Sequence, residues 1–195
     1  MEQVSTLFSL LPKGNLSQDR LGVSLECFNL NSIRDQLRSD GYSLCRELIP
    51  KAAIQQMRSR WLELFQTTEN TTGVTWEPYL GQKNRIGYTE DDFQCLYRAS
   101  DFLWNEPIDA LTREISLQLH VLRNLVAGID PFRGIQFSSD RYGVMVTASY
   151  YPPVKGRMQM HEDGVEPGKE LIHFIAPMTQ KGVDYLSGGM TLQDR

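Results

Sequence analysis

The sequence predicts an α+β fold in which helices come first and an antiparallel sheet or barrel follows. Apolar residues recur at three- and four-residue intervals as far as residue 128, and short extended runs between Pro- and Gly-rich turns come after it. The 195 residues are enough for one core but short for two domains. We therefore expect a single domain over residues 1–195.

Three helices are expected before the extended region. The first covers 29–40, because Asn29 can cap a first turn and Gly41 tolerates a left-handed stop. The other two follow from apolar stripes at helical spacing, and the second stripe ends at Gly128. His120 lies off that stripe, so we expect it at the surface or the boundary. The stripes are Ile54, Met57, Trp61, Leu64 and Phe65, then Ile108, Leu111, Ile115, Leu119, Leu122 and Val126.

The remaining segments are expected to be extended or irregular. Residues 67–100 lose helical periodicity and gather Thr, Asn, Gly and charged residues around aromatic side chains. This pattern favours a long loop, which either roofs a site or is pinned to the core by its aromatics. Five short strands are expected, at 42–48, 144–151, 157–161, 170–176 and 189–192.

Composition excludes several classes of function. The chain has 20 Lys+Arg against 24 Asp+Glu, a formal charge of −4, and no long run of either sign. It therefore lacks the basic footprint of a nucleic-acid-binding protein, and a small molecule or another protein is the expected partner. No apolar run approaches the roughly 18 to 20 residues that span a bilayer. We expect no membrane association, a cytoplasmic location, and reduced thiols at the scattered Cys27, Cys45 and Cys95.

One stretch carries candidate chemistry. If residues 157–163 are extended, side-chain alternation places Arg157, Gln159, His161 and Asp163 on one face. A His and an Asp two residues apart on one strand can point at a common metal ion. They supply two of the three ligands in the two-His, one-carboxylate set that holds non-haem Fe(II). The spacing alone is also typical of a strand-end histidine bonded to a carboxylate.

The surrounding residues resemble the Fe(II)/2-oxoglutarate-dependent oxygenase superfamily, in particular its isopenicillin N synthase-like and plant-type members. Tyr150-Tyr151-Pro152-Pro153 precedes His161-Glu162-Asp163, as a Tyr-Tyr-Pro stretch precedes the His-x-Asp motif of those enzymes. Pattern-level similarity extends over residues 31–195, through the segments 40–65, 108–126, 171–178 and 187–192.

The resemblance implies a fold, two cofactors and a set of site residues. The fold would be N-terminal helices packed on a double-stranded β-helix (jelly roll). His161 and Asp163 would bind Fe(II), and the Tyr151 hydroxyl would contact 2-oxoglutarate as co-substrate, with ascorbate as a further possible requirement. The reaction would be hydroxylation, or a related oxidation, of a small organic molecule. Arg157, Gln159 and His173 would be substrate or secondary contacts.

The sequence departs from the family in the residues expected after the His-x-Asp motif. In the superfamily the second histidine ligand and the cationic 2-oxoglutarate anchor come on later strands, and neither His120 nor His173 matches that position. We therefore expect 1–128 to be a helical lead-in with a long loop and 129–195 to be the first half of the barrel. A C-terminal continuation or a partner chain would supply the missing strands.

Two other readings remain open. A non-catalytic barrel or interaction domain could keep the scaffold without the distal metal ligand. A zinc-dependent barrel fits less well, because zinc sites usually gather three protein ligands and this region offers no nearby cysteine.

Overall fold

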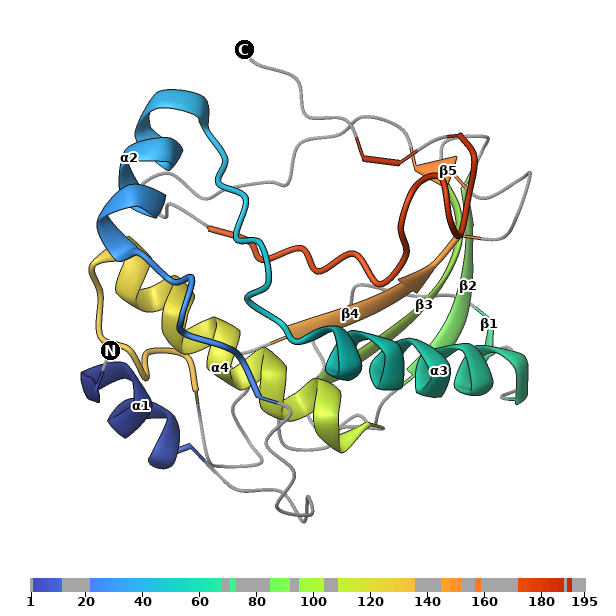
Figure 1. The fold of residues 1–195 in the computed structure, drawn as a ribbon. Helices are drawn as coiled ribbons and strands as arrows, with labels where there is room; N and C mark the ends of the chain where they lie inside the picture. The colour runs from blue at the N-terminus through green and yellow to red at the C-terminus, as the bar shows by residue number, and fades with distance from the viewer. Residues whose placement is uncertain are drawn as a thin grey trace.

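The computed structural model describes residues 2–11, 22–67, 71–72, 85–91, 95–103, 109–135, 145–151, 157–158, 172–187 and 189–190. It contains helices and one sheet (Figure 1). The helices are α1 (Glu2–Ser9), α2 (Leu30–Asp40), α3 (Lys51–Thr67) and α4 (Ala110–Ala127). The strands are β1 (Thr71–Thr72), β2 (Arg85–Asp91), β3 (Cys95–Leu103), β4 (Met145–Tyr150) and β5 (Arg157–Met158).

The three predicted helices are confirmed, and local capping sets their ends. The Asn29 side chain accepts a hydrogen bond from the backbone N–H three residues on, and α2 stops at Gly41 with φ of +75°. Asp109 caps α4 in the same way, and that helix stops at Gly128 with φ of +72°. A positive φ costs glycine little because it has no Cβ, so both stops are encoded locally. None of the described helices is long and apolar enough to cross a bilayer.

The sheet is centred on β3, which pairs antiparallel with β2, β4 and β5, while β1 pairs parallel with β2. β4 and β5 occupy the same side of β3, with Arg98 opposite Tyr150 and Leu96 opposite Arg157. Leu96 and Arg98 are two residues apart on β3, whereas their partners Arg157 and Tyr150 are seven residues apart in the sequence. The stretch that joins the two partner strands contains Pro152-Pro153, which has no N–H to donate to a ladder.

The predicted fold class, α+β with N-terminal helices packed on half of a jelly roll, is wrong. Three strands of the observed sheet, β1, β2 and most of β3, come from 67–100, where a long loop was expected, and they precede α4. Segments 42–48 and 172–176 and residues 189–190 are not strands. Alternating apolar residues favour an extended backbone, but a strand also needs a hydrogen-bonded neighbour, and that neighbour cannot be inferred from the alternation alone.

α4 is the central helix and contacts α1, α2 and α3. It contributes to two core clusters, so more than one of its faces is buried. The first core cluster also joins α3 to β4 near one face of the sheet (Figure 1). The first cluster comprises Leu48, Ala53, Met57, Trp61, Leu111, Ile115, Leu119, Leu122 and Ala148. The second core cluster comprises Leu11, Leu117, Val121 and Ile135.

Four buried polar side chains of α4 each bond another part of the chain. His120 is one of them, and its prediction as a surface or boundary residue is wrong because only 7% of it is exposed. A buried polar group without a partner is costly, so these bonds specify which segment docks at which turn of α4. The pairs are Thr112 with Trp61, Gln118 with the Val23 N–H, His120 with the Arg133 carbonyl, and Asn124 with the Pro131 and Arg133 carbonyls.

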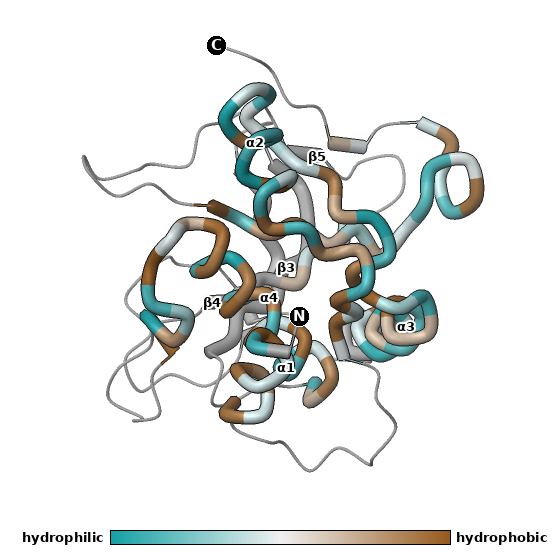
Figure 2. The backbone as a smooth tube through the Cα atoms, turned by 60° about the vertical axis from the view of Figure 1, so that its left-hand side comes forward, coloured by the Kyte–Doolittle hydropathy of each residue, from teal (hydrophilic) through white to brown (hydrophobic). Residues whose placement is uncertain are grey.

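α2 is mostly hydrophilic (Figure 2) and buries Ile33, so its docking depends on a polar contact as well. The Arg34 guanidinium donates from Nε to the Val126 carbonyl at 2.9 Å and from Nη2 to the Leu125 carbonyl at 2.6 Å. These carbonyls lie in the last turn of α4, where backbone oxygens lack partners within the helix and a positive charge is favoured.

We expect Arg34→Ala to lower the free energy of unfolding by about 1 to 2 kcal/mol, because two charge-assisted hydrogen bonds are lost from a partly exposed site. Urea denaturation measures the change. Arg38→Ala on the same helix is the control, since Arg38 pairs with Asp35 at the surface and should cost less than about 0.5 kcal/mol. Equal effects of the two substitutions would show that Arg34 does not dock α2.

Candidate functional site

The predicted metal ligands His161 and Asp163, together with Gln159, lie outside the described residues. Of the strand predicted at 157–161, the first two residues are described: Arg157 and Met158 form β5 and pair with β3. The prediction of a strand starting at Arg157 is therefore confirmed over residues 157–158. The backbone of Arg157 belongs to the same sheet as β4.

Tyr151 follows β4 directly and does not belong to the core. It is 44% exposed, as expected from the alternation along β4, in which Ala148 is buried, Ser149 is exposed and Tyr150 packs partly against the first core cluster. Ser149 and Tyr151 therefore lie on the face of β4 that points away from this cluster. Tyr151 is accessible to a ligand on that face.

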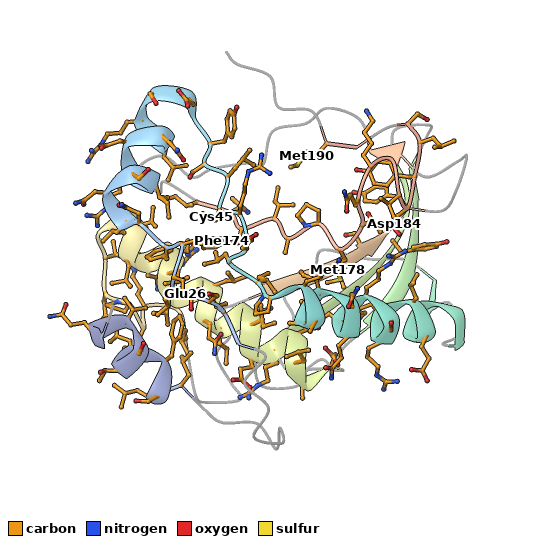
Figure 3. The ribbon with its side chains drawn as sticks, viewed as in Figure 1. Glu26, Cys45, Phe174, Met178, Asp184 and Met190 are labelled. Atoms are coloured by element: carbon orange, nitrogen blue, oxygen red, sulfur yellow. The ribbon has the colours of Figure 1, made fainter. Side chains whose placement is uncertain are left out.

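His173 lies in an extended segment, 172–178, that runs above β4 in the view of Figure 1. Phe174 and Met178 of this segment, both labelled in Figure 3, pack against the first core cluster. The side chains alternate, so the half-buried positions are Ile172, Phe174, Ala176 and Met178, and the exposed positions are His173, Ile175 and Pro177. The His173 side chain therefore points away from the first core cluster.

Asp184 lies in the turn at 180–185, which follows segment 172–178, and links this turn to α3 (Figure 3). One carboxylate oxygen accepts the Gln180 N–H at 2.7 Å, and the other lies 2.7 Å from the Arg58 guanidinium. The Gln180 N–H, and after it the bond and charge of Arg58, hold the pKa of Asp184 below its usual value. The turn at 180–185 and α3 are thus joined by a charged contact.

Acid or Asp184→Asn should weaken this contact. Because the folded-state pKa of Asp184 is lowered, its stabilising effect is complete above the ordinary aspartate pKa and is lost as the pH falls through the lowered value. We expect faster amide hydrogen exchange at Gln180 in Asp184→Asn at neutral pH, and the same increase in the wild type only in acid. Glu63→Gln, which removes an exposed partner of Arg60 on α3, should leave that amide unchanged.

A groove of about 370 Å³ lies between the start of α2 and residues 43–47, and both Cys27 and Cys45 line it. Both thiols are free. Burial raises the pKa of Cys45 more than its hydrogen bond with Ser43 lowers it, so this thiol stays protonated at neutral pH and is a poor nucleophile. Cys45 therefore gives this groove no activated nucleophile. Its lining comes from separate segments, so no local sequence pattern predicts it.

No group of three or more His, Cys, Asp and Glu side chains within the described ranges could hold a metal ion. His161 and Asp163 lie outside those ranges. Comparison with known proteins found no matching family, no matching curated protein and no matching solved structure.

Proposed function

We propose that the chain is an Fe(II)- and 2-oxoglutarate-dependent oxygenase that hydroxylates or otherwise oxidises a small organic molecule. The observation that carries this proposal is the pair His161 and Asp163, two residues apart in the sequence and closely following Tyr151-Pro152-Pro153. The pairing of Arg157 and Met158 with β3 supports an extended start of the strand predicted at 157–161.

The donor set fits Fe(II), because imidazole and carboxylate are the ligands of non-haem iron sites that leave positions open. Iron bound here would supply the oxygen chemistry, with 2-oxoglutarate as co-substrate. In this proposal His161 and Asp163 bind the metal, and the Tyr151 hydroxyl donates a hydrogen bond to a 2-oxoglutarate carboxylate. Arg157, Gln159 and His173 are proposed as substrate or secondary contacts. The exposure of Tyr151 supports a ligand contact over a role in the core.

The partners and the location belong to the same proposal. A formal charge of −4 without basic runs supports a small-molecule substrate over nucleic acid. The free thiols of Cys27 and Cys45 support a reducing, cytoplasmic location.

Anaerobic calorimetric titration with Fe(II), and with Mn(II) as a redox-stable probe, tests the proposal. We expect His161→Ala and Asp163→Ala each to weaken metal binding by more than about 10-fold, because each removes a direct ligand. Binding should also weaken in acid, since the ligand is neutral imidazole. His173→Ala is the matched control and should leave the affinity unchanged. Equal affinities of the wild type and both ligand variants would exclude this metal site.

Tyr151→Phe tests the co-substrate contact separately. We expect it to weaken 2-oxoglutarate binding to the Mn(II)-loaded chain by about 1.5 to 3 kcal/mol, the range for one hydrogen bond to a charged group. Phenylalanine keeps the ring, so the fold should be unaffected. An unchanged 2-oxoglutarate affinity would remove Tyr151 from the site.

A non-catalytic interaction domain is the second candidate. Exposed apolar side chains favour it, because large apolar residues in contact with water often mark a protein-binding surface. They lie in the C-terminal part of the described chain and are Ile175, Val183, Leu186 and Met190. A wild-type chain that binds neither Fe(II) nor Mn(II) would favour this candidate over the oxygenase.

A further inference from the structure

His120 is a buried titratable group with no part in the proposed reaction. Its Nε2 lies 2.8 Å from the Arg133 carbonyl, a distance that requires the Nε2–H to donate to that oxygen. The Arg123 Nη2 is 3.3 Å from the same nitrogen, and because both groups are donors this approach is not a second hydrogen bond. In the neutral imidazole the proton therefore sits on Nε2, and a second proton would go to Nδ1, which adds a positive charge but keeps the Nε2–H donor.

The bond from His120 closes residues 131–135 onto α4. Asn124 donates to the Pro131 and Arg133 carbonyls at 2.9 and 2.8 Å, so the two side chains hold the turn together. The turn ends in Ile135, which belongs to the second core cluster, and Leu11, just beyond α1, belongs to it too. Opening the turn would therefore also weaken the packing of α1 on α4.

The charges around His120 are mainly positive. Arg123 lies on its own helix, and Arg133 lies on the turn, close enough for its charge to lower the pKa of Arg123. Asp130 is the acid of the turn, and it is exposed and accepts the Phe132 N–H. Residues 3–11, which include the described side chains of α1, carry no charge.

A second proton on His120 would therefore place a positive charge in a buried site next to two guanidinium groups. Desolvation disfavours that charge, and Arg123 repels it. Both causes lower the pKa of His120, burial more than Arg123, and the bond to Arg133 opposes them only in part.

We propose that His120 is an acid-operated latch, whose protonation releases residues 131–135 from α4 and loosens α1 with them. The first core cluster, which joins α3, α4 and β4, contains no residue of the turn and stays closed; Val4 and Phe8 of α1 pack against it and keep α1 partly attached. The device is thus a local opening rather than acid unfolding of the whole chain. It does not depend on the proposed oxygenase activity.

The direction of the pH effect follows from linkage. A base whose folded-state pKa is lowered stabilises the closed form fully above its ordinary pKa, and that stabilisation is lost as the pH falls from there toward the lowered value. With an ordinary histidine pKa of about 6.5, the opening constant at pH 5 can rise by up to about 30-fold relative to neutral pH.

Hydrogen exchange of the wild-type chain at pH 7.5 and pH 5.0, corrected for intrinsic rates, measures the opening. We expect protection in residues 129–135 to fall by up to about 30-fold at pH 5.0, protection in residues 2–11 to fall by less because Val4 and Phe8 also pack on the first core cluster, and protection in α3 not to change. His120→Gln keeps a neutral donor that does not titrate, so protection should be the same at both pH values. His173→Gln, at an exposed histidine, should behave as the wild type.

The latch is contradicted if wild-type protection of residues 129–135 does not fall, or if it falls equally in His120→Gln. If His120→Gln does not fold, the imidazole of the wild-type chain is titrated by NMR instead. The latch requires His120 to titrate below the ordinary histidine value, in step with signal changes in residues 131–135. Titration at the ordinary value, or without those changes, would overturn it.

Discussion

Replacing Trp61 by alanine should lower the free energy of unfolding by about 3 to 5 kcal/mol, which is the usual cost of deleting a large buried aromatic side chain. Trp61 is 3% exposed and lies in the first core cluster between α3 and α4. Its Nε1–H also donates to the Thr112 hydroxyl at 2.9 Å, so truncation removes both packing and a buried hydrogen bond. Urea denaturation followed by far-ultraviolet circular dichroism measures the loss.

The contributions of packing and of the Trp61–Thr112 hydrogen bond can be separated. Trp61→Phe keeps much of the apolar contact but removes the donor, and we expect it to cost about 1 to 2 kcal/mol. A double-mutant cycle of Trp61→Phe with Thr112→Val should then give a favourable coupling energy between the two side chains. A cost below about 1 kcal/mol for Trp61→Ala would contradict the burial of Trp61 between α3 and α4.

Asn124→Ala has the second largest expected effect, about 2 to 4 kcal/mol. Asn124 is 0% exposed, donates to the Pro131 and Arg133 carbonyls, and accepts from the Arg123 guanidinium through Oδ1. Alanine would leave these groups without their partner and would create a small cavity. The change is again measured by urea denaturation.

The position of the increased hydrogen exchange in Asn124→Ala is as informative as the size of the stability loss. In Asn124→Ala we expect hydrogen exchange to increase most in residues 129–135, at neutral as well as acid pH, because two of the three side-chain hydrogen bonds from α4 to the turn are lost. Asn31→Ala, at an exposed position of α2, is the control and should change stability by less than about 0.5 kcal/mol. An increase spread evenly over α3 and α4 would contradict a local role.

The helices were predictable because their signals are local. Asn29 and Gly41 lie at the ends of one helix. The apolar spacing of α3 and α4 is also a local signal, which can be recognised without knowing what the helices pack against. A single apolar stripe did not reveal that α4 is buried on more than one face. Its polar residues, such as His120 and Asn124, face carbonyls of the turn at 131–135, and sequence cannot show which buried group finds a partner elsewhere.

The sheet was less predictable, because strand pairing is not local. β2 and β3 carry Thr, Asp, Arg and Ser among their apolar residues, so their alternation was weak and the region was interpreted as a loop. Residues 172–178 have a clear alternation and are extended, yet they do not form a strand. The jelly roll was implied by the family resemblance, and the observed strand order does not support it.

The candidate metal site rests on a local motif, whereas the groove lined by Cys27 and Cys45 could not be predicted. His161 and Asp163 are two residues apart, so alternation alone relates their side chains. The groove combines residues from both sides of α2. The outward orientation of His173 also needed the packing of Phe174 and Met178, because alternation did not tell which face of that segment is buried.

The chain has three histidines, so NMR of imidazole nitrogens with substoichiometric Mn(II) tests the metal site most directly. Paramagnetic broadening is strongest at a direct ligand, and Mg²⁺ serves as the diamagnetic control. The oxygenase proposal predicts strong broadening of His161, with His120 and His173 much less affected, and loss of that broadening in Asp163→Ala. No broadening at His161, or stronger broadening at His120 or His173, would contradict it.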